Sequence, residues 1–157
     1  MAMEISLTKK IKADPSFVFD WWTDLSPDDS KLVKPLKSRT VLSRSPERIL
    51  LRDEEEMYFK KMSFDVVVTL HRPNSWTAEY RGASATARSE YRLKSEMDNT
   101  TTLVYKSRIE PTGSLARLFS PIVKYFVKRV FAGEMEIFVD TLERDFANWQ
   151  MNRPDEV

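Results

Sequence analysis

Tyrosines and carboxylates are the side chains of this sequence that could carry out proton chemistry. The chain has one histidine, His71, and no cysteine, so a histidine-based triad or a thiolate metal site is hard to assemble. With only three glycines it also lacks a glycine-rich phosphate loop. We therefore expect no metal and no cofactor. The remaining candidates for acid–base work are Tyr80, Tyr91 and Tyr105, with Asp53 or Glu55.

Composition limits the kind of protein that could hold these residues. A chain of 157 residues with 41% hydrophobic residues can bury one core, and we expect residues 1–157 to form a single domain. The formal net charge of +1 provides no overall field for a nucleic acid, so we expect no nucleic-acid partner. No signal peptide or membrane-spanning run is visible, which predicts a cytoplasmic location.

The first part of the chain predicts a strand and a short helix. Residues 4–12 alternate between apolar and polar side chains, as a half-buried strand does. Asp14 and Pro15 then form a helix start, because aspartate caps the first turn and proline fits the first helical position. Apolar residues at helical spacing continue to Leu25. Residues 26–35 contain two prolines and predict an irregular connector.

The middle of the chain predicts antiparallel strands, and the end predicts one long helix. Residues 114–149 form an amphipathic helical stretch, although Ser120 and Pro121 could mark its true start. Such a helix must cover the sheet, since each element has one apolar face. The strands are expected at residues 38–43, 48–53, 62–72, 76–81, 86–97 and 101–110.

These lengths predict space between the helix and the sheet. A helix of about 30 residues is about 45 Å long, whereas a strand of about 10 residues is about 33 Å long. A twisted sheet cannot contact a straight helix along its whole length. Where the two separate, large side chains fill the gap or a ligand occupies it.

The order of elements resembles the START-like or SRPBCC superfamily, in particular its polyketide cyclase/dehydrase and lipid-transport branch. The resemblance rests on the opening strand that runs into residues 13–25, and on residues 111–119 that lead into the long helix. It implies an α+β helix-grip fold, in which a bent antiparallel sheet of about six or seven strands wraps around the C-terminal helix. It also implies a small apolar or amphipathic ligand, such as a lipid, an isoprenoid or a polyketide-like compound.

The faces expected to point inward mix small side chains with large ones. Gly133 lies in mid-helix, where glycine costs up to about 1 kcal/mol relative to alanine, so it either leaves room for a ligand or marks a close helix–sheet contact. The candidate ligand-binding residues are Trp22, Phe64, Trp76, Tyr80, Ser89, Tyr91, Tyr105, Phe126, Val130, Gly133 and Ile137.

The sequence favours ligand carriage but leaves two other functions open. A cyclase or dehydratase could use the same cavity, with a tyrosine or carboxylate moving protons. A regulatory or interaction module would instead have a filled core. Basic residues in the first half of the helix, Arg117, Lys124 and Lys128, could make transient contact with a membrane surface. The sequence favours the alternative, in which they form a solvated face paired with acidic residues of the sheet.

Overall fold

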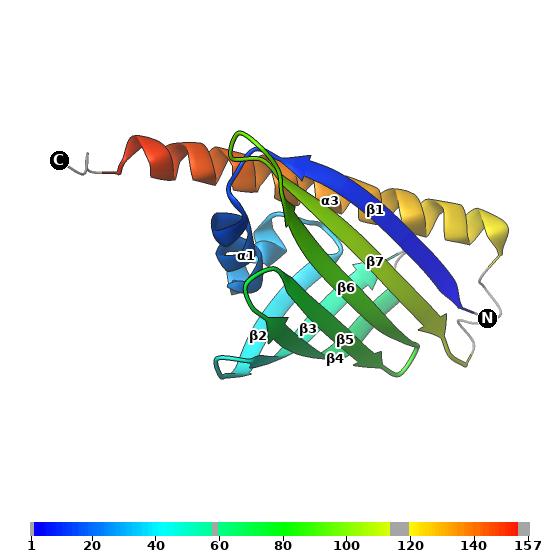
Figure 1. Ribbon diagram of the computed structural model, residues 1–157. Helices are drawn as coiled ribbons and strands as arrows, with labels where there is room; N and C mark the ends of the chain where they lie inside the picture. Colours follow the sequence, from blue (N-terminus) through cyan, green and yellow to red (C-terminus); the bar gives the residue numbers. More distant parts are fainter. Residues whose placement is uncertain (1, 58–59, 114–119, 154–157) are drawn as a thin grey trace.

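A computed structural model describes residues 2–57, 60–113 and 120–153 (Figure 1). It contains one antiparallel sheet, a short helical region after the first strand, and a long C-terminal helix. The elements are β1 (Met3–Ile11), α1 (Pro15–Thr23), the 3-10 helix η1 (Pro27–Lys31), β2 (Leu36–Arg44), β3 (Arg48–Met57), β4 (Lys60–His71), β5 (Ser75–Gly82), β6 (Ala85–Ser95), β7 (Thr101–Pro111) and α3 (Pro121–Met151).

The sheet has seven strands in the order β1-β7-β6-β5-β4-β3-β2. Strands β2 to β6 each pair with the next strand along the chain, and β1 pairs with β7. The sheet bends, and α3 runs along it beside β1 (Figure 1). The expected α+β helix-grip arrangement is therefore confirmed.

Helix α1 begins where the sequence predicts. The Asp14 carboxylate accepts a hydrogen bond of 2.8 Å from the backbone N–H of Phe17, which satisfies one of the free donors of the first turn. Pro15 occupies the start of the helix, where its missing N–H is not needed. The side chains of Phe19 and Trp22 are buried between α1 and the sheet, and the Trp76 ring of β5 packs against both of them.

Helix α3 starts at Pro121, the later of the two starts that the sequence allows. The Ser120 hydroxyl accepts a hydrogen bond of 3.3 Å from the Val123 backbone N–H and so caps the helix. Residues 114–119 lie outside the described residues. The last turns of α3 extend past the sheet (Figure 1), where Phe146 packs against Phe17 with ring centroids 5.0 Å apart. None of the described helices is both long enough and apolar enough to cross a membrane.

Strand β2 departs from regular pairing in a way that matters for the interior. Its register with β3 shifts between Leu36 and Ser38, and again between Val41 and Ser43. A bulge adds a residue on one strand and so changes which side chains point to each face. As a result Leu36 and Arg39, three positions apart, both point inward. Arg39 lies directly opposite Asp53 of β3.

Candidate ligand-binding cavity

A cavity of about 450 Å³ lies between the concave side of the sheet and α3. Strands β2 to β7 supply the sheet wall, α1 and the segment around η1 supply one end, and α3 supplies the opposite wall. The volume is within the range of about 300–1,000 Å³ that is typical of small-molecule sites. The interior is therefore not filled by side chains, which removes the filled-core alternative.

Aromatic rings form one part of the wall. The rings of Trp76 and Tyr91 stack with centroids 4.9 Å apart and planes only 10° from parallel. The ring centroid of Trp22 in α1 is 5.6 Å from that of Phe138 in α3. Trp22 also packs against Trp76, so it connects the helix wall to the sheet wall. Offset stacking and tilted contacts of this kind are favourable for aromatic rings. A flat apolar ligand would find matching surfaces here.

A buried hydrogen-bonded group of hydroxyls lies on β6 and β7. The Ser89 hydroxyl donates to the Ser107 oxygen at 3.0 Å, and the Ser89 and Tyr105 oxygens are 3.3 Å apart. Ser89 and Ser107 are paired across the two strands, which explains how they meet. Burial raises the pKa of Tyr105, although hydrogen bonds from the two serines act in the opposite direction. The phenol therefore stays protonated.

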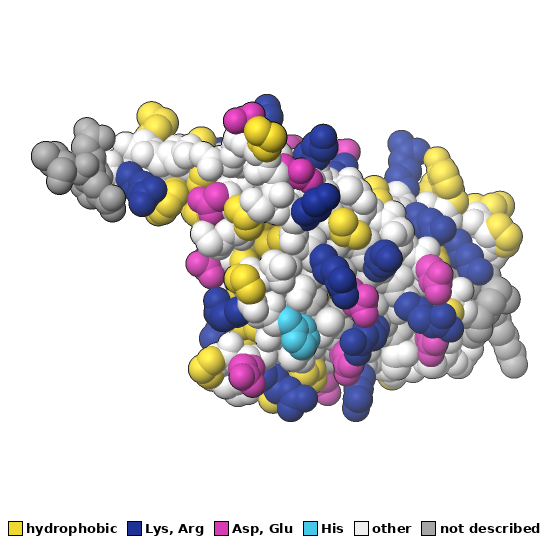
Figure 2. Space-filling view, in the orientation of Figure 1, with side chains coloured by type: hydrophobic (Ala, Val, Ile, Leu, Met, Phe, Trp, Pro, Cys, Tyr) yellow, Lys and Arg dark blue, Asp and Glu magenta, His cyan; other side chains and the backbone are white. Residues whose placement is uncertain are grey.

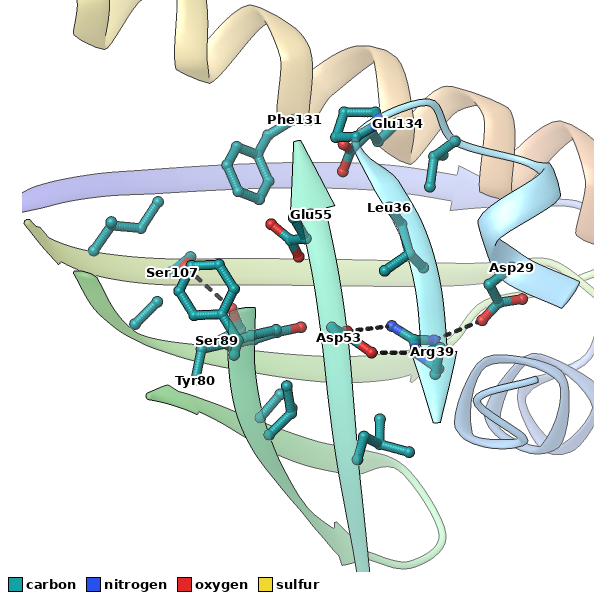
Figure 3. Close-up of a pocket in the computed structure, with 18 of the residues that line it drawn as sticks. Asp29, Leu36, Arg39, Asp53, Glu55, Tyr80, Ser89, Ser107, Phe131 and Glu134 are labelled. Atoms are coloured by element: carbon teal, nitrogen blue, oxygen red, sulfur yellow. Dashed lines mark hydrogen bonds and ion pairs between the residues drawn. The ribbon is translucent and has the colours of Figure 1, made fainter. Parts of the chain in front are cut away.

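Arg39 is neutralised by two carboxylates at the edge of the cavity (Figure 3). Its Nε and Nη2 each donate to Asp53 at 2.9 Å, and its Nη1 donates to Asp29 at 2.8 Å. Burial acts to lower the pKa of Arg39, but its hydrogen bonds to Asp53 and the negative charge of Asp53 raise the pKa by more, so the guanidinium stays charged. Burial also raises the pKa of Asp29 to about 6, despite the opposing charge of Arg39. The cluster ties η1 to the sheet and leaves no unpaired positive charge on Arg39.

Two further carboxyls face the cavity from opposite walls. Glu55 projects from β3 and Glu134 from α3, and both point into the same region (Figure 3). Burial raises the pKa of Glu55 to about 7, and the negative charge of Asp53 adds to this effect. Burial likewise raises the pKa of Glu134 to about 8, with a contribution from Glu55. We call Glu55 and Glu134 the carboxyl pair.

The remaining tyrosines of the wall are hydrogen-bond donors rather than bases. Burial raises the pKa of Tyr80, and the negative charge of Asp53 adds to this effect. Burial also raises the pKa of Tyr91 well above its usual value. Within the described part of the chain, neither hydroxyl has a hydrogen-bonding partner, although both residues line the cavity. They are available to orient a ligand.

The structure brings together the candidate residues of α1 and of the sheet. The side chains that border the cavity are those of Trp22, Phe64, Trp76, Tyr80, Ser89, Tyr91 and Tyr105. Their role in binding a ligand stays a prediction. Asp53 and Glu55 both face the cavity, so the face of β3 that carries them is turned inward, as the sequence analysis allowed. His71 is exposed at the end of β4. Among the described residues, no group of acidic or histidine side chains is arranged to hold a metal ion.

The expected helix wall is wrong by about one position along α3. Phe126 and Ile137 are 46% and 43% exposed, and neither Val130 nor Gly133 borders the cavity. Gly133 faces outward, and a Cβ placed there would meet nothing within 4 Å. Each residue turns a helix by 100°, so a shift of one moves the stripe off the sheet. The residues of α3 that border the cavity are Val123, Val127, Phe131, Glu134, Met135 and Phe138.

Arg39 and Glu134 are the important residues that sequence reasoning missed. The apolar stripe that continues to Leu142 and Phe146 could have identified the inner face of α3, and Glu134 lies on that face. For Arg39 the only signal was its place two residues before Val41 on one strand face. The bulges of β2 weaken that signal, because they interrupt the alternation.

No protein-family model matches the sequence, and comparison with curated proteins finds no match. Comparison with solved structures finds close likeness in shape. The Zhui aromatase/cyclase from Streptomyces sp. R1128 superposes with a TM-score of 0.77 at 12% identity, over 92% of this chain and 95% of that one.

Two further structures extend the comparison. A START superfamily protein from Mycobacterium smegmatis has a TM-score of 0.71 at 16% identity, over 94% of this chain and 99% of that one. Ara h 8.0201 has a TM-score of 0.64 at 9% identity, over 90% of this chain and 98% of that one. At such identities the likeness concerns the fold, which is START-like.

Proposed function

We propose that this protein, which has the START-like helix-grip fold, binds and carries a small apolar or amphipathic molecule in the cavity between its sheet and α3. A lipid, an isoprenoid or a polyketide-like compound would suit the mixture of side chains. The observation that carries the proposal is the cavity of about 450 Å³, lined mostly by aromatic and aliphatic side chains with a few polar groups on its walls.

The physical basis of binding is removal of apolar surface from water. Each Å² of buried apolar surface contributes about 25 cal/mol before the costs of association. The stacked pair of Trp76 and Tyr91 provides a flat surface for this contact. Hydroxyls of Tyr80 and Tyr91 set the orientation, because they remain protonated and have no partner among the described residues. The polar groups therefore select among ligands of similar size.

Native mass spectrometry of the protein purified from its own cells tests this proposal. The expected result is a retained small molecule that disappears when the same sample is denatured. Uptake of the neutral dye Nile red provides a second measurement. Ala87→Phe places a ring inside the cavity and should abolish uptake, whereas Gly133→Phe places the same ring on the outer side of α3 and should leave it unchanged. Equal uptake by both variants and the parent protein would contradict the proposal.

A cyclase or dehydratase is the second candidate function. The observation in its favour is the carboxyl pair, because the pKa of Glu55 is raised by burial to about 7 and that of Glu134 to about 8. A group whose pKa lies near the working pH is suited to general acid–base catalysis. Within the described residues no carboxylate is hydrogen-bonded to an inward tyrosine, a contact that would have favoured catalysis more strongly.

The molecule retained in cells distinguishes the two functions. If the protein only carries its ligand, the parent protein and the Glu55→Gln variant should retain the same compound. If it dehydrates its substrate, Glu55→Gln should retain a compound heavier by one water molecule, because the variant binds but does not turn it over. Nile red uptake should be unchanged in the variant, which shows that the cavity is intact.

We also propose transient contact between a membrane surface and the start of α3. Exposed apolar side chains gather there, with Ile122 68%, Tyr125 59% and Phe126 46% exposed. Lys124 and Lys128 lie on the same turns, and basic and hydrophobic side chains are mixed at this end of the molecule (Figure 2). Apolar rings beside lysines suit the interface of anionic lipids. Arg117, also expected to contribute, lies outside the described residues.

A cytoplasmic location and a single domain stay predictions from the sequence.

A further inference from the structure

The carboxyl pair has an unusual environment for two acids. Glu55 and Glu134 come from different walls and face the same part of the cavity (Figure 3). The charge of Glu55 raises the pKa of Glu134. Neither has a hydrogen bond or an ion pair within the described residues. Two facing carboxyls without a counter-ion cost free energy when ionised, and a cation between them would remove that cost.

The groups that surround the pair do not supply this cation. Arg39 is the basic side chain whose charge lowers the pKa of Glu55, but it is already held by Asp53 and Asp29. Lys60 borders the cavity, yet it is not among the groups that shift the pKa of either carboxyl. The other titratable groups that act on the region from β5, β6 and β7 are the phenols of Tyr80, Tyr91 and Tyr105.

We propose that the polar group of the carried ligand is a protonated amine that lies between the carboxyls of Glu55 and Glu134. This inference rests on the proposed carrier function and adds the chemistry of the ligand's polar end. The two carboxylates would hold the ammonium from opposite walls with charge-assisted hydrogen bonds, while the apolar body of the ligand lies against the aromatic wall. A ligand with a carboxylate would meet like charges at the same place.

Binding of an ammonium requires the carboxyls to give up protons. At neutral pH the empty pair holds protons, because burial raises the pKa of Glu55 to about 7 and that of Glu134 to about 8. The amine nitrogen keeps its own proton, and the carboxyl protons pass to solvent. Affinity for an amine should therefore increase as pH rises through this range, until the amine itself loses its proton.

Three probes with one aromatic body test the inference: 1-pyrenemethylamine, 1-pyrenemethanol and 1-pyreneacetic acid. Each is titrated into the whole protein and followed by pyrene fluorescence. The amine is expected to bind at least about tenfold more tightly than the acid, which corresponds to about 1.4 kcal/mol. Its affinity should rise from about pH 6 to about pH 9, and isothermal titration in two buffers of different ionisation enthalpy should detect released protons.

Matched variants locate the effect. Glu55→Gln and Glu134→Gln should each weaken binding of the amine about tenfold or more and change binding of the alcohol by less than about threefold. Glu54→Gln and Glu136→Gln are the controls, since both residues are exposed on the same strand and the same helix, and they should change neither.

The outcomes separate this inference from the function on which it rests. If no pyrene probe binds and Nile red is not taken up, the carrier function itself fails. If the alcohol and the acid bind as tightly as the amine, or if Glu55→Gln and Glu134→Gln leave amine binding unchanged, only the amine inference is overturned. Affinity that falls as pH rises would also overturn it, because it would indicate a ligand that accepts hydrogen bonds from protonated carboxyls.

Discussion

The guanidinium of Arg39 donates two parallel hydrogen bonds to the carboxylate of Asp53, from Nε and from Nη2, both 2.9 Å long. The two residues are direct neighbours across β2 and β3, and the Asp53 side chain is only 1% exposed. Two parallel charge-assisted hydrogen bonds of this kind are stronger than hydrogen bonds between neutral groups, and they fix the geometry of the pair. Each partner stabilises the fold by neutralising the other, because an unpaired charge in the interior costs free energy.

Removal of Arg39 alone should therefore destabilise the protein strongly. Arg39→Met leaves the buried Asp53 charge without its partner, and loss of one member of a buried pair costs about 3–5 kcal/mol. Arg52→Met is the control, since the Arg52–Asp65 pair is exposed and such pairs are worth less than about 1 kcal/mol. Urea unfolding gives both free energies. Equal losses in the two variants would contradict this reading of the cluster.

Stability should fall as pH rises from about 4.5 to about 8, because of the carboxyl pair. Burial raises the pKa of Glu55 to about 7 and that of Glu134 to about 8, from 4.5 in an unfolded chain. Between these values the folded protein binds more protons than the unfolded chain, so the free energy of unfolding decreases with pH. This stability is fully present below about pH 4.5 and lost as pH rises through the folded pKa values.

Glu134→Gln should reduce that pH dependence. The variant keeps a neutral side chain at every pH, so at about pH 9 it should be at least about 1 kcal/mol more stable than the parent protein, while at about pH 5 the two should be similar. Urea unfolding at several pH values measures the effect. The exposed Glu136→Gln should leave the slope unaltered. An identical slope in Glu134→Gln and the parent would show that Glu134 ionises normally.

The two glycines in regular elements should respond oppositely to alanine. A Cβ at Gly82 would lie 2.8 Å from the Phe64 ring and 2.8 Å from the Ser63 carbonyl oxygen, so Gly82→Ala should cost about 1–3 kcal/mol. Gly133 is exposed in mid-helix with open space around it, so Gly133→Ala should stabilise by up to about 1 kcal/mol. Thermal and urea unfolding measure both. A loss of stability in Gly133→Ala would contradict the outward placement of that residue.

Membrane contact at the start of α3 predicts a localised loss of binding. Replacing both Ile122 and Phe126 with serine removes exposed apolar surface and should reduce co-sedimentation with phosphatidylserine vesicles several-fold. Leu42→Ser is the control, because Leu42 is 53% exposed on β2, away from this helix. If the parent protein binds the vesicles as weakly as the double serine variant does, the proposed membrane contact is contradicted.

Local pattern was sufficient for the strands and for the start of α1. The side-chain period of a strand is two, so alternation alone placed Trp76, Ser89 and Tyr105 on the inner face. The sequence left two starts open for α3. Asp14 caps α1 through a bond to a backbone N–H only three residues away, which is why its sequence signal was reliable. These features depend on neighbours in the chain and need no knowledge of distant contacts.

Only the tertiary structure decided which stripe of α3 faces the sheet and which charges are buried. Apolar residues occur around much of α3, so Phe126 and Ile137 formed a plausible stripe even though the packed one passes through Val127 and Met135. A glutamate at position 134 reads as a surface residue, because a charge is costly to bury. Its inward position follows from the rotation of the helix against the sheet, which depends on contacts between segments far apart in the chain.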